Sequence, residues 1–123
     1  MNEIKNGYKV VRENEKGELV SASVGLKLVK YGIGENAKPR TFCGPLTLFT
    51  DKSFVNGFID SLPKGEDRKY RVFKCTYVPT DITTVHRVTV AEGLKTKSIG
   101  ALPAGTVLAK SIYLTEEIFP TRF

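Results

Sequence analysis

The chain has 123 residues, of which 41% are hydrophobic and 26% are charged, and 19 lysines and arginines against 13 acidic residues give it a net charge of +6. This length favours a single domain, 1–123, and this composition is that of a globular protein. No apolar run approaches the roughly 20 residues that a membrane-spanning helix needs, and the first residues lack the apolar region of a signal peptide, so we expect a cytoplasmic protein.

The N-terminal third of the chain predicts β-structure. Gly7–Glu13 alternates as a strand does, and Gly17 lies in a short segment typical of a hairpin turn. Leu19–Val24 predicts the returning strand, and Leu26–Tyr31 predicts a third strand or a continuation of the second. Residues 32–40 contain two glycines and a proline and predict a loop.

The middle of the chain predicts a short buried strand followed by a helix. Leu46–Phe49 is apolar enough for the strand, and Asp51–Leu62 has its apolar residues at helical spacing. Thr50 or Asp51 can cap the helix, and Pro63 ends it. The apolar stripe must lie on a sheet, because a short helix is not stable alone. It consists of Phe54, Val55, Phe58, Ile59 and Leu62.

The second half of the chain returns to β-structure. Tyr70–Val78 is rich in β-branched and aromatic residues and is the clearest strand, and Thr83–Val90 predicts its hairpin partner. Ala91–Gly105 predicts a loop, with room for a second short helix near Ala91–Lys95, and Thr106–Leu114 predicts the last strand. We therefore expect an α+β fold, an antiparallel sheet of six or seven strands with one or two short helices packed on one face.

Few residues in the chain suit metal binding or catalysis. Cys43 and Cys75 are the only cysteines and His86 is the only histidine, whereas a structural zinc needs about four such ligands. We expect two buried, reduced thiols, no metal and no cofactor. His86 could act as a general base or simply occupy a strand position, and no paired carboxylates or nucleotide-binding motif accompany it, so we expect no enzyme activity.

The positive charge is spread along the chain among acidic residues, which argues against a nucleic-acid partner and suits the attraction of a small anion. We expect no membrane partner either, because the apolar runs are short. Arginines and aromatic residues recur on or beside the predicted strands. Arginine presents a planar fork to phosphate and an aromatic face can stack on a purine, so these residues form our candidate ligand-binding set. The set is Arg12, Arg40, Phe42, Arg71, Phe73, Arg87 and Tyr113.

The order of several segments provides a further indication. They are Tyr8–Arg12, Gly17–Ala22, Gly44–Leu46 with Phe49 before a short helix, Phe73–Pro79, and Leu102–Ala109. In this order the chain resembles small phage and prophage proteins of the Thoeris anti-defence type one family. The resemblance implies a sponge that captures cyclic ADP-ribose signals made by bacterial TIR-domain enzymes and holds them uncleaved in a homodimer or higher homo-oligomer. The resemblance assigns no individual ligand-binding residue of that family to a position in this chain.

Other functions remain open on the sequence alone. Arg12 and the late Glu116 weakly resemble the pair used by ADP-ribosyltransferases, but Glu116 and Glu117 are adjacent and do not form the Glu-x-Glu pair of those enzymes. An enzyme that degrades the signal is a second alternative. A protein-binding inhibitor of host immunity is a third, because the tail Ile118–Phe123 carries three large apolar residues that could contact a partner.

Overall fold

The computed structural model describes residues 4–22, 29–38, 45–62, 69–89, 93–98, 100, 102 and 105–118, with the backbone alone for 85–89 and 93–98. In these ranges the chain forms nine strands and one helix. They are β1 (Lys5–Glu13), β2 (Leu19–Ser21), β3 (Lys30–Tyr31), β4 (Asn36–Ala37), β5 (Leu46–Phe49), α1 (Lys52–Ser61), β6 (Lys69–Pro79), β7 (Thr84–Thr89), β8 (Gly93–Ser98) and β9 (Thr106–Ile118).

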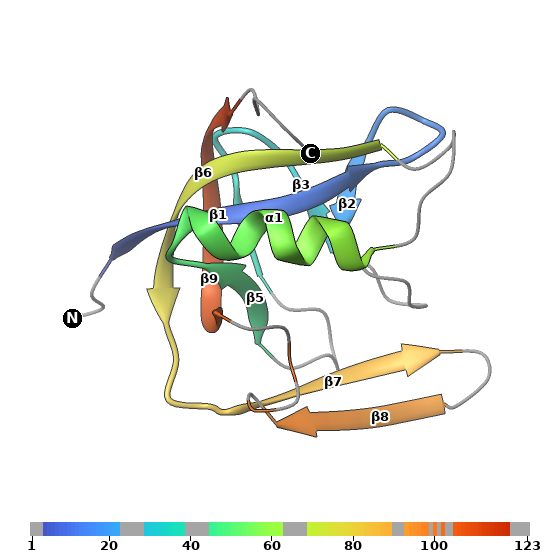
Figure 1. Ribbon diagram of the computed structural model, residues 1–123, viewed down its shortest axis with the longest axis vertical. Coiled ribbons are helices and arrows are strands. Elements are labelled where there is room, and N and C mark those ends of the chain that lie inside the picture. The colour runs from blue at the N-terminus through green and yellow to red at the C-terminus, as the bar shows by residue number, and fades with distance from the viewer. Residues whose placement is uncertain are drawn as a thin grey trace.

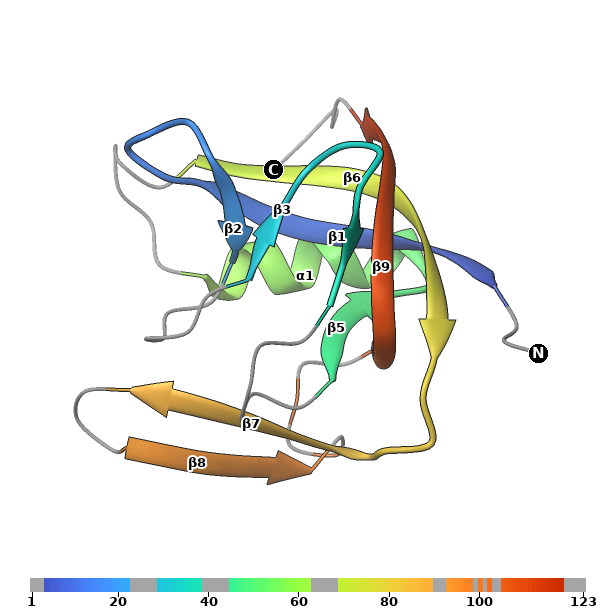
Figure 2. The same ribbon diagram turned by 180° about the vertical axis from the view of Figure 1, so that it is seen from behind.

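Seven of these strands form one antiparallel sheet that closes on itself. β6 pairs with β1 from Lys5↔Tyr77 to Glu13↔Lys69, and it also pairs with β9 from Val72↔Ile118 to Pro79↔Ala109. β5 pairs with β1 and with β9, which completes a circuit of four strands. β6 bends from the direction of β1 to that of β9 (Figures 1 and 2), and the short strands β2, β3 and β4 extend the sheet.

The closed sheet has an inner and an outer apolar cluster. The inner cluster is the larger, and Phe73, Ile112 and Leu114 are fully buried in it. On the outer face α1 lies along β1 (Figure 1), and its buried residues Val55 and Ile59 belong to the second cluster. Burying each of these large side chains contributes roughly 1.5–3 kcal/mol, and this is what holds so short a helix in place.

Local contacts set both ends of α1. Asp51 is the N-cap, and its carboxylate accepts a hydrogen bond from the Ser53 amide at 2.9 Å. At the other end the Leu62 amide donates to the Ile59 carbonyl at 3.1 Å. Gly105, at φ 81°, lies against the Phe54 ring, so both its backbone conformation and the lack of room require a glycine there.

The fold class predicted from the sequence is confirmed, because a mostly antiparallel sheet of seven strands carries one helix. The predicted strand Tyr70–Val78 is β6, and the predicted helix is α1 with Asp51 as its cap. The hairpin turn at Gly17 is also present, with φ 79°. Cys75 is buried and reduced, whereas Cys43 lies outside the described residues.

Three predictions in less regular parts of the chain were wrong. The segment 84–89 does not form a hairpin with β6, because β7 pairs with β8 instead. Gly93–Ser98 is that partner strand, where a loop or a second short helix was expected. The loop expected at 32–40 contains β4, since two residues there pair with β9. β7 pairs with the next strand in the sequence instead of the preceding one, and at β4 hydrogen bonding to the distant strand β9 overrode weak local propensity.

One lysine lies inside the closed sheet. Lys9 is 6% exposed, its ammonium nitrogen donates to the Thr47 carbonyl oxygen at 2.6 Å, and it lies 5.2 Å from the centre of the Tyr31 ring. Burial lowers the pKa of Lys9 to about 8, an effect that the nearby Cys75 thiolate would partly offset. Burial in turn raises the pKa of the Cys75 thiol to about 12.

We expect this pair to set the pH at which the protein is most stable. Above pH 8 folded Lys9 loses its proton while the unfolded lysine keeps its own up to 10.5, so the free energy of unfolding rises. Above pH 9 the Cys75 thiol loses its proton in the unfolded chain but keeps it in the folded protein. This difference opposes any further rise in the free energy of unfolding. Urea unfolding should therefore show a rise of about 1 kcal/mol between pH 7 and 9, and Lys9→Met should abolish it.

The exposed Lys52, on the first turn of α1, provides the control. Lys52→Met should retain the rise, since that side chain is not buried. A rise of the same size in Lys9→Met would contradict the assignment to Lys9.

Candidate functional site

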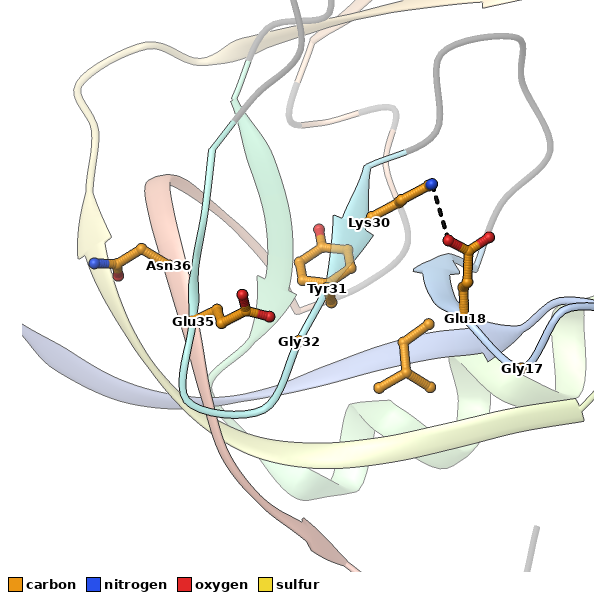
Figure 3. A pocket seen from close by; sticks show the side chains of 8 residues that line it. Gly17, Glu18, Lys30, Tyr31, Gly32, Glu35 and Asn36 are labelled. Atoms are coloured by element: carbon orange, nitrogen blue, oxygen red, sulfur yellow. Dashed lines mark ion pairs between the residues drawn. The ribbon is translucent and has the colours of Figure 1, made fainter.

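A hollow of about 440 Å³ lies beside β2, β3 and β4 (Figure 3). It is bounded on one side by the end of the first hairpin and on the other by the turn between β3 and β4. Its lining residues come from two stretches that are close in sequence, Gly17–Leu19 and residues 30–36. They are Gly17, Glu18, Leu19, Lys30, Tyr31, Gly32, Glu35 and Asn36.

The turn between β3 and β4 is held in place by backbone hydrogen bonds. The Glu35 amide donates to the Gly32 carbonyl at 3.1 Å, and the Gly34 amide donates to the Leu114 carbonyl of β9 at 2.9 Å. The Glu35 carboxylate lies against the Gly32 backbone in space that any side chain at Gly32 would occupy. Figure 3 shows this carboxylate on the side of Tyr31, while Asn36 points away from it.

The hollow is acidic. Glu18 forms an ion pair with Lys30 at 2.9 Å and accepts a hydrogen bond from Asn14 at 3.0 Å. These contacts, with the Asn14 hydrogen bond the larger cause, lower the pKa of the Glu18 carboxyl. Within the described part of the chain the Glu35 carboxylate has no ion-pair or hydrogen-bond partner. Two carboxylates and one ammonium group suit a ligand that presents hydroxyl or amino donors.

Tyr31 connects the hollow to the interior of the sheet. It lines the hollow but is only 7% exposed, and its ring lies next to the buried Lys9 ammonium group. Burial raises the pKa of its hydroxyl further above the ordinary value of 10.0, at which a phenol is already neutral at physiological pH.

Of the predicted ligand-binding residues that the structure describes, Tyr113 lies beside the turn that borders this hollow. It is the direct strand partner of Asn36, and it lies beside Gly34 in the turn. Its side chain is 38% exposed, and the neighbouring Ile33 is 56% exposed. Tyr113 and Ile33 therefore form an exposed apolar rim at the β3–β4 turn, which borders the hollow.

Arg71 and Phe73 contribute to the fold. Arg71 makes two hydrogen bonds to Glu117, at 2.6 and 2.8 Å, and a third to Glu13 at 3.2 Å. Its guanidinium group lies 5.4 Å from the centre of the Phe73 ring, and Phe73 is fully buried. Arg71 is thus paired with two carboxylates, and the Phe73 ring is enclosed by the core and the Arg71 guanidinium group.

The two predicted arginines whose side chains the structure describes, Arg12 and Arg71, lie on different faces of the sheet. Arg12 follows Tyr8 and Val10 on the outer face of β1, whereas Arg71 precedes Phe73 on the inner face of β6. The Arg12 Nε atom is buried and has no hydrogen-bond partner among the described residues. Arg87 lies on β7, where only the backbone is described, and Arg40 and Phe42 lie outside the described residues.

Sequence reasoning assigned no role to the residues that line the hollow. The segment 30–36 reads Lys-Tyr-Gly-Ile-Gly-Glu-Asn, and its two glycines predicted only a turn. The available signal was the cluster of polar and charged residues around those glycines, since functional side chains often lie on turns held by a rigid scaffold. That cluster becomes a site only because the Gly17 hairpin lies opposite it.

No protein-family model, curated protein or solved structure matches this chain. Within the described ranges, no group of three or more histidine, cysteine or acidic residues is arranged to hold a metal ion. The helix found there, α1, has neither the length nor the apolar character to cross a membrane. The function must therefore be argued from the site itself.

The ion pairs of Arg71 lead to a stability prediction. Arg71→Ala should lower the free energy of unfolding at pH 7 by about 1–2 kcal/mol, because it removes a two-pronged, partly buried contact with Glu117. The Arg71 hydrogen bonds lower the pKa of Glu117, so this contribution exists above the carboxyl's ordinary value of 4.5 and disappears as the pH falls below it. Urea titrations at pH 7 and about pH 3 measure both effects.

Lys74→Ala is the matched control, because it removes only the exposed Lys74–Glu116 pair at 3.1 Å. We expect that change to cost less than about 0.5 kcal/mol. Equal losses in the two variants at pH 7 would show that the Arg71 contacts contribute no more than an ordinary surface pair.

Proposed function

We propose that this protein binds a small ribose-containing nucleotide and holds it uncleaved, as a phage anti-defence sponge for cyclic ADP-ribose signals made by TIR-domain enzymes. The observation that carries the proposal is the hollow with the Glu35 carboxylate on its wall, which has no partner among the residues that the structure describes. The identity of the ligand rests on the resemblance noted in the sequence. The proposal places the protein in the cytoplasm of the host bacterium, where such signals are produced.

The size and chemistry of the hollow suit part of such a ligand. A volume of about 440 Å³ falls within the range of small-molecule sites. The carboxylates of Glu18 and Glu35 can accept hydrogen bonds from ribose hydroxyls, each worth about 1.5–3 kcal/mol. Lys30 lies at the edge, where it can contact a phosphate oxygen once its pairing with Glu18 is released.

The exposed rim supports assembly into a homodimer or higher homo-oligomer. Ile33 and Tyr113 lie next to the hollow and expose apolar surface that a second copy would cover. A second copy would also reduce the access of water to the ligand and strengthen its polar contacts. A sponge must bind its ligand tightly, because each site removes only one ligand molecule and does not turn over. Nanomolar affinity corresponds to a binding free energy of about 12 kcal/mol.

The function is tested by capture and release. Purified protein is incubated with the product of a TIR-domain enzyme, filtered to remove free nucleotide, and heated. We expect loss of the nucleotide from the filtrate and recovery of the same nucleotide, by mass and retention time, from the heated protein. Recovery of a cleaved product would identify an enzyme, and absence of capture would overturn the proposal.

Glu35→Gln should weaken nucleotide binding at least tenfold in isothermal titration calorimetry. An amide is a weaker acceptor than a carboxylate for ribose hydroxyls and places an NH₂ group where an acceptor is needed. Glu15→Gln removes the same charge from an exposed position that does not line the hollow, and it should bind as the wild type does. Equal affinity of both variants would exclude the hollow as the binding site.

A further inference from the structure

The β7–β8 ribbon is separate from the main sheet. Within the described residues its two strands hydrogen-bond only to each other, as a two-stranded antiparallel sheet. Both views show the ribbon apart from the closed sheet, beyond the end of β5 (Figures 1 and 2). A two-stranded ribbon has little apolar area of its own to bury, so we expect it to bind a partner mainly through its charge and its shape.

The register places three cations on one face of the ribbon. Directly opposed residues in an antiparallel pair share a face, and residues two apart along a strand share it as well. Arg87 pairs with Lys95, and Lys97 lies two residues farther along β8, opposite Val85. The other face carries His86, Thr96 and neutral residues. Neither strand contains an acidic residue, so no residue of the two strands themselves offsets the three positive charges.

This arrangement has an electrostatic cost. Like charges directly opposed across two strands destabilise the pairing, and Arg87 and Lys95 are opposed in this way. Lys97 adds a third charge about 7 Å along the strand. An anionic partner with several regularly spaced charges would turn this repulsion into attraction.

We propose that the β7–β8 face carrying Arg87, Lys95 and Lys97 binds the phosphate backbone of duplex DNA. The major groove of B-DNA is wide enough for a two-stranded ribbon, and arginine and lysine supply the commonest contacts to phosphate. The ribbon has no aromatic residue of the kind that dominates protein interfaces, and its basic face has no large apolar side chain for insertion into a membrane. Duplex DNA is therefore the partner that its charge and shape fit best.

The arrangement of charge on the ribbon differs from what the sequence predicted. The sequence argued against a nucleic-acid partner because its basic residues are spread along the chain among acidic residues. Strand alternation and the β7–β8 register gather Arg87, Lys95 and Lys97 on one face. The binding is expected to be weak and independent of sequence, and it does not depend on the proposed nucleotide site.

The test is fluorescence anisotropy with a labelled 20-base-pair DNA duplex of mixed sequence, measured at several salt concentrations from 50 to 200 mM. The triple variant Arg87→Gln/Lys95→Gln/Lys97→Gln should bind at least tenfold more weakly than the wild type at 50 mM salt. Its plot of log affinity against log salt should be shallower by about 3, since each lost phosphate contact removes about 0.9 from the slope. Circular dichroism establishes that the variant is folded.

The matched control is Lys16→Gln/Lys52→Gln/Lys110→Gln, which removes three exposed lysines outside the ribbon. Its net charge equals that of the triple ribbon variant. It should lose less than threefold in affinity. Equal losses in the two triple variants would overturn the proposal in favour of a general charge effect, as would the absence of DNA binding by the wild type. Equally strong binding of poly-glutamate would point to an acidic protein and would also overturn it.

Discussion

The pairing of β6 with two different strands is the constraint on which the rest of the structure depends. β6 pairs with β1 from Lys69 to Tyr77 and with β9 from Val72 to Pro79, and it changes direction along its length. Register shifts near Lys74 and Val78 accompany that change, as expected for bulges in a strand that must bend. Once β6 has joined β1 to β9, β5 can close the circuit.

Closure gives every long strand an inner and an outer face. On β6, Phe73, Cys75 and Tyr77 enter the inner cluster, whereas Val72 packs in the cluster beneath α1. The inner space is small and apolar, yet it holds Lys9, whose pKa burial lowers. The same closure ties Arg71 to Glu13 and Glu117, because it brings the ends of β1 and β9 to opposite sides of β6.

The two proposed binding surfaces lie where the regular sheet ends. The hollow lies among short strands and turns, where carboxylates can face solvent without the cost of burial. The ribbon stands outside the closed sheet and gathers positive charge. An acidic hollow and a basic ribbon on one small domain suit different ligands, so each can be tested by variants that leave the other unchanged.

The sequence by itself determined the parts of the fold with strong local patterns. β6, β5 and α1 could be predicted because alternation, helical spacing and the Asp51 cap are properties of neighbouring residues. The tertiary structure alone decided that β7 pairs with β8, that Arg12 and Arg71 occupy opposite faces, and that Glu35 lies opposite the Gly17 hairpin. The last two outcomes depend on contacts between segments that are distant in the sequence, and local patterns carry almost no information about such contacts. β8 was missed for a different reason, because Gly93–Ser98 contains few residues that favour strands.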